Sequence, residues 1–407
     1  ESTLYVGMNA GVTIKGEVSS QEEGRLLIGK AGARELENLS DIKKENQYLI
    51  AENAAASVFA FGNSDAVGVK HAKGIYQGTQ ENIANGLIQV KLEEKNNSQN
   101  YSYYIDWYQA VQEINYLGDP EADYEMSVLS DIVYTKRLDE KGKEIKTPGV
   151  FSLPAINKCN SFTVKGNHHK VSFARVDVVN NRTVLEELYL LPQNDKIDLT
   201  LKSNKKGEGT LLLKHVQQEE SVSTLFRNIT GSDKKTMLCL TDDTEITAAG
   251  NVKGIGTLCI GADEDEQEAG DGRLFVSGTL SAGLLNISSS VPGSLENSAV
   301  IVTGQMTVEK LNGQNGVLVI RQTSAKNAAP LGKVTGTSDR STDAPLTVLV
   351  LRPDITSVNL YRQRIAGKDT PFTDRAEGVP LIQAPGLSAD IITTAQVEET
   401  EAGYAIK

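Results

Sequence analysis

Carboxylates are the most concentrated chemically useful side chains in this sequence. Residues 263–271 read Asp-Glu-Asp-Glu-Gln-Glu-Ala-Gly-Asp. Hard oxygen ligands at this density suit Ca²⁺, so Asp263, Asp265 and Asp271 are candidate calcium ligands. The run lacks the spacing of an EF-hand loop, and an exposed loop held extended by its own charge is the simpler interpretation.

Other residues that could act in catalysis lack the additional catalytic or metal-binding residues that such sites require. Asp242 and Asp243 follow an apolar run, and paired carboxylates are what a glycosidase uses. The sequence has no Gly-His-Gly motif and no ordered set of Arg and Lys to accompany them, so a solvated loop is the simpler interpretation. His168 and His169 are adjacent in a predicted turn, where their side chains would point apart rather than bind one metal. The sequence therefore predicts no catalytic site.

Aromatic residues gather in one stretch, 101–135, which holds the single Trp and seven of the 13 Tyr. Trp107, Ala110, Val111 and Ile114 have the spacing of an amphipathic helix, predicted at about 106–117 with Asp106 as its N-cap. Such a helix could cover the open end of a stack of strands. Alternatively, aromatic rings stack on sugars, which makes a weak carbohydrate-binding set of Trp107, Tyr103, Tyr104 and Tyr108.

Short apolar runs must provide the scaffold that positions all of these residues. Each run is rich in aliphatic and β-branched residues, is bounded by turn formers and is too short for a stable helix, which predicts strands. The steps between successive runs vary from under 20 to about 30 residues, near the length of one rung of a parallel β-solenoid with loops of uneven length. The runs are 237–240, 257–261, 274–278, 300–304, 317–320 and 346–351.

Two details of these runs make sharper predictions. Cys239 and Cys259 hold the same place in Leu-Cys-Leu and Leu-Cys-Ile, so in neighbouring rungs they would lie one strand spacing apart. Two apolar core residues are the simpler interpretation, and a disulfide is the alternative. Apolar residues at both parities of 348–351 predict that the outward face of the 300–351 strands is covered. Were Ile301, Leu318 and Leu349 exposed, that face would be an interface.

The domain organisation follows from changes in pattern along the chain. Residues 1–100 are predicted to be a β-rich segment, either the end of an upstream solenoid or a compact sandwich, with a linker at 93–100. Residues 101–407 are predicted to hold the capping helix and the β-solenoid, closed by a final strand pair from 379–386 and 404–406. Because the first residues already have a strand pattern, we expect a longer precursor.

Composition limits the classes of partner. The 407 residues carry 41 Lys and Arg against 53 Asp and Glu, a formal net charge of −12. An acidic chain without a basic cluster argues against nucleic acid and against attraction to an anionic membrane surface. No stretch has the roughly 20 apolar residues of a membrane span, so we predict no membrane insertion.

The order of several motifs resembles a known family. Trp-x-x-Ala-Val-x-x-Ile-Asn starts at Trp107, Asp-Tyr-x-x-x-Val-Leu-x-Asp starts at Asp123, and Leu153-Pro154 and Phe-Thr-Val-Lys-Gly at 162–166 follow, before the repeated strands. Over about 101–360 this pattern resembles the β-solenoid surface proteins secreted by Gram-positive gut bacteria, which are themselves similar to the pectin-lyase-like right-handed β-helix. The resemblance implies a right-handed parallel β-helix that is secreted or attached to the cell wall.

The expected function follows from the scaffold and from the resemblance. The first hypothesis is a non-catalytic extracellular protein with an adhesive role, or one that binds or presents a ligand, such as a carbohydrate or a host surface protein. The alternatives are a polysaccharide lyase or glycoside hydrolase of the β-helix type and a purely structural cell-wall module. No cofactor is predicted apart from the Ca²⁺ already considered.

Overall fold

Strands dominate the structure, a computed structural model of the chain. It describes residues 3–6, 25–29, 57–61, 89–95, 97–104, 107–132, 137–138, 144–145, 149–218, 225–262, 270–293, 295–321, 330–336, 346–351, 380–384, 387, 389–392 and 397–406. Strands make up 55% of these residues and helix is almost absent. The predicted strand-rich class with parallel sheets is therefore confirmed.

The chain divides into two compact units. The first comprises residues 1–173 and 183–189, and the second comprises residues 174–182 and 190–407. The predicted boundary at residue 100 falls inside the first unit.

The first unit contains a short parallel sheet and the start of a longer sheet. β1 (Thr3–Val6), β2 (Arg25–Gly29) and β3 (Ser57–Phe61) pair in parallel. β4 (Val90–Glu94) pairs antiparallel with both β5 (Asn97–Tyr104) and β6 (Asp123–Val128), and β10 (Ser161–Lys165) pairs in parallel with β6. The predicted linker at 93–100 is wrong, because most of it lies in β4 and β5. Its polar residues are compatible with β5 because this strand ends the strand order of its sheet.

Several short strands are divided between the two units. They are β7 (Arg137–Leu138), β8 (Glu144–Ile145), β9 (Val150–Phe151), β11 (Lys170–Phe173), β12 (Arg175–Val176), β13 (Arg182–Glu186), β14 (Tyr189–Pro192) and β17 (Gln217–Gln218).

One helix, α3 (Trp107–Leu117), occupies the place predicted for it. Trp107, Ala110, Val111 and Ile114 are buried, as their helical spacing requires. The helix ends where the backbone N–H of Gly118 donates to the carbonyl of Ile114 at 2.8 Å. The proposed N-cap, Asp106, lies outside the described residues.

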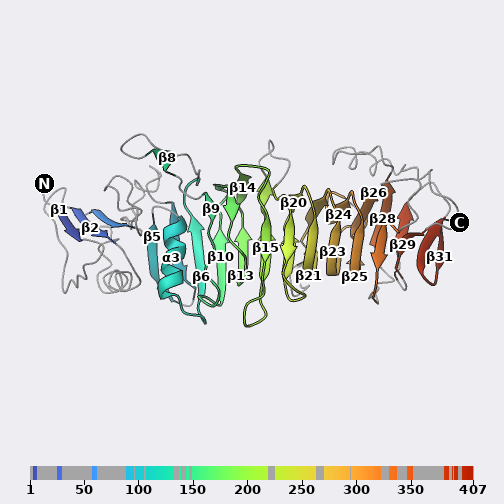
Figure 1. Cartoon of the computed structure of the whole chain (residues 1–407), viewed down its shortest axis with the longest axis horizontal. Coiled ribbons are helices and arrows are strands. Elements are labelled where there is room, and N and C mark those ends of the chain that lie inside the picture. Colours follow the sequence, from blue (N-terminus) through green and yellow to red (C-terminus); the bar gives the residue numbers. More distant parts are fainter. Residues whose placement is uncertain are drawn as a thin grey trace. The chain divides into compact units, whose positions relative to one another are not determined.

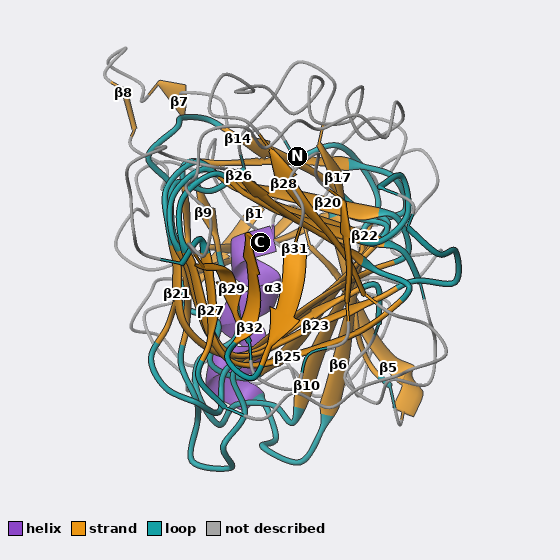
Figure 2. Ribbon diagram, turned by 90° about the vertical axis from the view of Figure 1, so that its right-hand side faces the viewer, coloured by secondary structure: helices purple, strands orange, loops and turns teal. Residues whose placement is uncertain are grey.

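The second unit contains two parallel sheets between which the chain alternates. The strands lie side by side in sequence order (Figure 1), and the two sheets lie on different sides of a shared interior (Figure 2). One sheet contains β16 (Thr210–Lys214), β19 (Met237–Thr241), β21 (Val252–Ile260), β23 (Leu280–Ser288), β25 (Met306–Gln314), β27 (Gly332–Val334) and β29 (Pro380–Gln383), with β15 (Leu199–Leu201) and β18 (Ile229–Gly231) beside them. The six-stranded sheet contains β20 (Thr244–Ala248), β22 (Gly272–Val276), β24 (Ala299–Val302), β26 (Val317–Arg321), β28 (Leu346–Leu351) and β30 (Ala389–Ile392).

The predicted apolar runs stack in register, but in two series rather than the single series that was expected. Runs 237–240 and 257–261 pair in one sheet, and runs 274–278, 300–304, 317–320 and 346–351 pair in the six-stranded sheet. Leu258 lies opposite Leu238 and Leu285, and Cys259 lies opposite Cys239. Both cysteines are buried and no disulfide joins them, which agrees with two core residues on neighbouring rungs. Equivalent side chains thus stack at the strand spacing of about 4.8 Å, and every turn adds one more layer to the same apolar interior.

A ladder of polar side chains holds the corner directly before β15, β18, β21 and β23. Asn228 donates its backbone N–H to the Asp198 carboxylate at 3.1 Å, and Asn251 donates to the Asn228 side-chain oxygen at 3.0 Å. Thr279 continues the series by donating to the Asn251 side-chain oxygen at 2.9 Å. Each side chain therefore satisfies a backbone donor of the next rung, which a bent strand cannot do for itself.

Glycine directly precedes two members of this ladder, with Gly250 before Asn251 and Gly278 before Thr279. A Cβ atom on Gly278 would lie 2.6 Å from the carbonyl oxygen of Gly250, and one on Gly304 would lie 2.4 Å from that of Gly278. Successive corners therefore approach more closely than any other residue type would allow.

The outward face of the six-stranded sheet is covered, as predicted. Ile301 and Leu349 are 2% and 1% exposed, so they do not form the open interface that was the alternative. Leu318 is buried too, but it lies opposite Val300 and Val348 on the other face of the sheet, so its inclusion in the outward set was wrong. Leu295, from the loop before β24, packs in one cluster with Phe275, Ile301 and Leu349, among others. The strands are thus apolar on both faces because both faces have something to pack against.

An antiparallel pair ends the second unit. β32 (Gly403–Ile406) pairs antiparallel with β29 and with β31 (Val397–Thr400). The predicted closing strands at 379–386 and 404–406 are therefore confirmed as neighbours. Exposed Glu398 and Glu399 on β31 would discourage another strand from adding to this edge.

Candidate functional site

The predicted carbohydrate-binding aromatic residues differ in exposure, since Trp107 is buried and Tyr108 is exposed. Trp107 is 0% exposed, donates its indole N–H to the Ser152 carbonyl at 2.6 Å and lies 4.6 Å from Phe151 between ring centroids. Phe162 meets it edge-on with centroids 6.5 Å apart. Trp107 is thus a core residue whose faces are occupied by the protein itself.

The three tyrosines remain a prediction. Tyr108 is 39% exposed, next to the buried Trp107. Tyr103 and Tyr104 lie on β5 opposite Lys91 and Val90 of β4. The structure does not describe the side chains of Tyr103 and Tyr104.

The histidine pair lies in a tight turn, as predicted. Asn167 and His168 have φ angles of 48° and 59°. His169 Nδ1 lies 3.1 Å from the Asp131 carboxylate, which also accepts the backbone N–H of Lys170 at 3.0 Å. Burial would raise the pKa of Asp131, but these contacts outweigh it and lower that pKa below its ordinary value. The sequence shows no carboxylate near the histidine pair, but the fold brings Asp131 to it from a neighbouring rung. There Asp131 holds the turn in place through these hydrogen bonds.

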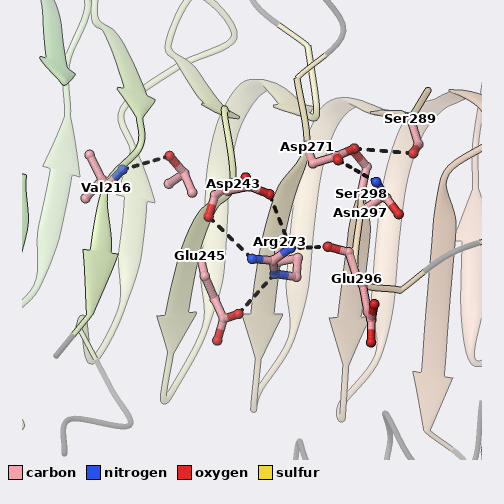
Figure 3. A network of polar contacts seen from close by, with 10 residues as sticks. Val216, Asp243, Glu245, Asp271, Arg273, Ser289, Glu296, Asn297 and Ser298 are labelled. Atoms are coloured by element: carbon pink, nitrogen blue, oxygen red, sulfur yellow. Dashed lines mark hydrogen bonds and ion pairs between the residues drawn. The ribbon is translucent and has the colours of Figure 1, made fainter. Parts of the chain in front are cut away.

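The predicted calcium ligands can be followed only in part. Asp263 and Asp265 lie outside the described residues. Asp271 accepts the side-chain amide of Asn297 and lies 3.4 Å from the Ser289 hydroxyl (Figure 3). These neighbours donate hydrogen bonds to the carboxylate, as they would to anchor a loop. Within the described residues, no group of three or more His, Cys, Asp or Glu could hold a metal ion.

A polar cluster surrounds Arg273 on β22 (Figure 3). Its Nε donates to the Glu245 carboxylate at 3.0 Å, and one terminal nitrogen lies 3.9 Å from the Asp243 carboxylate. The other terminal nitrogen donates to the carbonyl of Asp243 at 3.4 Å, and the guanidinium also bonds the carbonyl of Glu296. The Arg273 side chain is only 16% exposed.

This Arg273 cluster ties three successive strands of the six-stranded sheet together. Asp243 and Glu245 belong to the turn before β20 and to β20, Arg273 to β22, and Glu296 to the loop before β24. A planar guanidinium offers donors in a fixed fork, so one arginine can bind several oxygens at once. The paired carboxylates noticed at Asp242 and Asp243 therefore contribute one member to an ion-pair network, and their φ angles of 53° and 61° place both in a tight turn.

Sequence reasoning missed Arg273 and Glu245. Glu245 and Arg273 lie opposite each other in the register of β20 and β22. β20 was not among the predicted apolar runs, so the sequence did not indicate which residue would face Arg273. Only the strand register shows that these two residues pair.

Comparisons with known proteins add no identity to this geometry. No family model, no curated protein and no solved structure matches the chain. Within the described residues, the helical part is neither long nor apolar enough to cross a membrane.

Proposed function

We propose that this chain is a non-catalytic right-handed parallel β-helix, secreted or attached to a cell wall, which presents its surface to a ligand such as a carbohydrate or a host surface protein. The supporting observation is that from β19 to β30 the chain alternates between two parallel sheets in register. Crossover connections between parallel strands of one sheet are almost always right-handed, because strands of L-residues twist in one sense.

The helix fits this proposal as a cap. Its apolar face is buried, and Trp107 is fixed by Ser152 and Phe151 rather than left for a ligand. In a β-helix, the first rung needs such a cover for its open apolar end.

The Arg273 cluster supports a non-catalytic role. A lyase or hydrolase needs a charged group that remains available to the substrate. Arg273 instead is engaged with Glu245, Asp243 and Glu296 across neighbouring strands. The cluster nonetheless gives the enzyme alternative its one specific observation, since a cation stands beside two carboxylates.

A combined binding and cleavage assay tests the proposal. The purified chain is applied to an array of glycans and incubated with soluble polysaccharides, with new reducing ends and unsaturated products measured over time. We expect binding without cleavage. Cleavage that is lost in Asp243→Asn, and kept in the exposed control Asp195→Asn, would instead establish an enzyme centred on the Arg273 cluster. Neither binding nor cleavage would favour a structural wall module.

A further inference from the structure

The fold brings lysines together into a basic surface, although the chain as a whole is acidic. Two turns of the second unit each contain a lysine pair, in Ser203-Asn204-Lys205-Lys206 and Ser232-Asp233-Lys234-Lys235. These turns follow β15 and β18, which pair in parallel with Leu201 opposite Gly231. The lysine pairs therefore lie on neighbouring rungs although they are far apart in sequence.

Direct contacts join the two turns. Ser203 donates its hydroxyl to the Asp233 carboxylate at 2.5 Å, and Ser232 donates its backbone N–H to the Leu201 carbonyl at 2.9 Å. The next rung adds Lys253, which lies opposite Thr230. The resulting lysine patch comprises Lys202, Lys205, Lys206, Lys234, Lys235 and Lys253, all of them exposed.

The turns are held in shape by their own side chains. The Asn204 side-chain oxygen accepts the backbone N–H groups of Lys206 at 2.8 Å and Glu208 at 3.0 Å. Asp233 accepts the backbone N–H of Lys235 at 2.9 Å. Fixed turns lower the conformational entropy that the backbone loses on binding, so the patch is preorganised.

The patch keeps an excess of positive charge, because its six lysines outnumber the nearby carboxylates of Glu208, Asp233 and Glu309. Lys234 is paired with Glu309, at 2.6 and 2.9 Å. Within the described residues, no ion pair joins Lys202, Lys205, Lys235 or Lys253 to a carboxylate. A concentration of cations on a chain of net charge −12 is therefore an isolated electropositive surface.

The chemistry of the patch selects among polyanions. All of the basic residues in 202–209, 230–236 and 253–256 are Lys, and none of these residues is aromatic. Lysine acts as a point charge, whereas arginine supplies the planar fork that matches a carboxylate. Aromatic rings, on which unpaired bases stack, are missing from these segments, which disfavours single-stranded nucleic acid. Hydroxyl groups of Ser203, Thr230 and Ser232 beside the lysines suit the hydroxyl groups of a sugar.

We infer that the lysine patch binds a sulfated linear polysaccharide, with lysines of three successive rungs contacting sulfate groups along the polymer. Rungs repeat every ~4.8 Å, so Lys205 and Lys206 lie alongside Lys234 and Lys235, while Lys253 lies beside Thr230 on the next rung. An extended polymer that crosses the rungs can therefore meet lysines of all three. This inference rests on the proposed role in ligand binding, for which it names the ligand class and the site.

Heparin is the probe for the test, with the full chain and its charge-reversal variants. Lys205→Glu with Lys235→Glu alters the patch, and Arg175→Glu with Lys196→Glu is the matched control, since it changes the net charge equally at exposed positions outside it. We expect at least a tenfold weaker Kd for the patch variant, less than a threefold change for the control, and weaker binding as salt is raised. Thermal unfolding of all variants verifies that exposed substitutions leave the fold intact.

Other outcomes would overturn the inference in distinguishable ways. Failure to bind heparin at low salt, or equal losses in both variants, would remove the site. Tighter binding to polygalacturonate than to heparin would mean that the ligand carries carboxylates rather than sulfates. Tighter binding to DNA would mean that the ligand is a nucleic acid rather than a polysaccharide. Binding to neutral glycans alone would keep the proposed function and reject the patch. Cleavage of a polysaccharide would reject the proposed function whatever the patch binds.

Discussion

Single polar residues hold this protein together at its corners. Asn228 and Asn251 each use a side-chain oxygen to satisfy a backbone N–H of the next rung. Such residues are usual in turns, yet here they act between turns rather than within one. The same logic applies to Arg273, which joins three strands through its guanidinium.

Replacing Asn251 by Ala should destabilise the protein. The Thr279 N–H would lose the acceptor that now lies 2.9 Å away, and an unsatisfied, half-buried donor costs about 1–2 kcal/mol. The free energy of unfolding in denaturant measures the effect. Ser277→Ala, an exposed change near the same corner, should stay within about 0.5 kcal/mol of the native chain. Equal stabilities of the two variants would mean that the ladder contributes nothing.

Asp198 should make part of the stability depend on pH. The hydrogen bond from Arg227 is the main cause of a lowered Asp198 pKa, and the side chain and backbone of Asn228 add to it, while burial opposes it. Because this pKa lies below its unfolded value near 3.8, the contribution is complete above that value and is lost as the pH falls through the folded-state pKa. Its size should stay below about 1 kcal/mol, since both partners are more than one-third exposed.

Denaturant unfolding of the native chain and of Asp198→Asn, from neutral pH to about pH 3, measures this dependence. The difference in unfolding free energy should be largest at neutral pH and should shrink in acid. A difference that grew in acid would contradict the assigned ion pair.

At the scale of elements, apolar pattern and burial agree closely. β19, β21, β22, β24, β26 and β28 could be predicted because each apolar run is short and bounded by turn residues. β20, β23, β25 and β27 were missed, because polar residues interrupt their apolar pattern. Cys239 and Cys259 even revealed the register of two rungs, since a matching residue at a matching place is a stacking signal. The apolar runs therefore predicted parallel stacking in the second unit, but not the missed strands or the division of the runs between two sheets.

What the sequence could not show depends on pairing between distant segments. Residues 93–100 resemble a linker because nothing in Asn-Ser-Gln-Asn at 97–100 reveals that β4 lies alongside. The Arg273 cluster and the lysine patch are hidden for the same reason. Their members are separated by whole rungs, and only the register brings them together. The candidate surfaces are thus properties of the stacking, whereas the strands are properties of local sequence.

Leu295 gives a test of the covered sheet face. It is 7% exposed and packs with Phe275, Ile301 and Leu349, so Leu295→Ala should leave a cavity that costs about 2–3 kcal/mol. The unfolding free energy in denaturant again provides the readout. Val291→Ala, a truncation in the same loop at a side chain that is 45% exposed, should change stability far less. Similar losses in the two variants would show that the loop does not cover this face.

At the scale of the second unit, one repeating arrangement explains the features described here. Parallel rungs in register create the apolar interior, the corner ladder and the rows of equivalent surface positions. A long-range β arrangement of this kind is built from neighbouring contacts only, so each rung depends chiefly on the rungs beside it. The proposed function needs nothing further than a stable surface on which exposed side chains recur.

Paired cysteine substitutions measure this register directly. Thr307 and Lys333 are exposed partners on β25 and β27, and parallel neighbours lie about 4.8 Å apart, within reach of a disulfide. The matched pair joins Thr307 to Thr335, two residues farther along the chain and on a diagonal of about 7–8 Å. Mild oxidation followed by non-reducing mass spectrometry should find the bond between Thr307→Cys and Lys333→Cys, and should find none between Thr307→Cys and Thr335→Cys. A bond in the second pair alone, or in neither, would contradict parallel stacking in register.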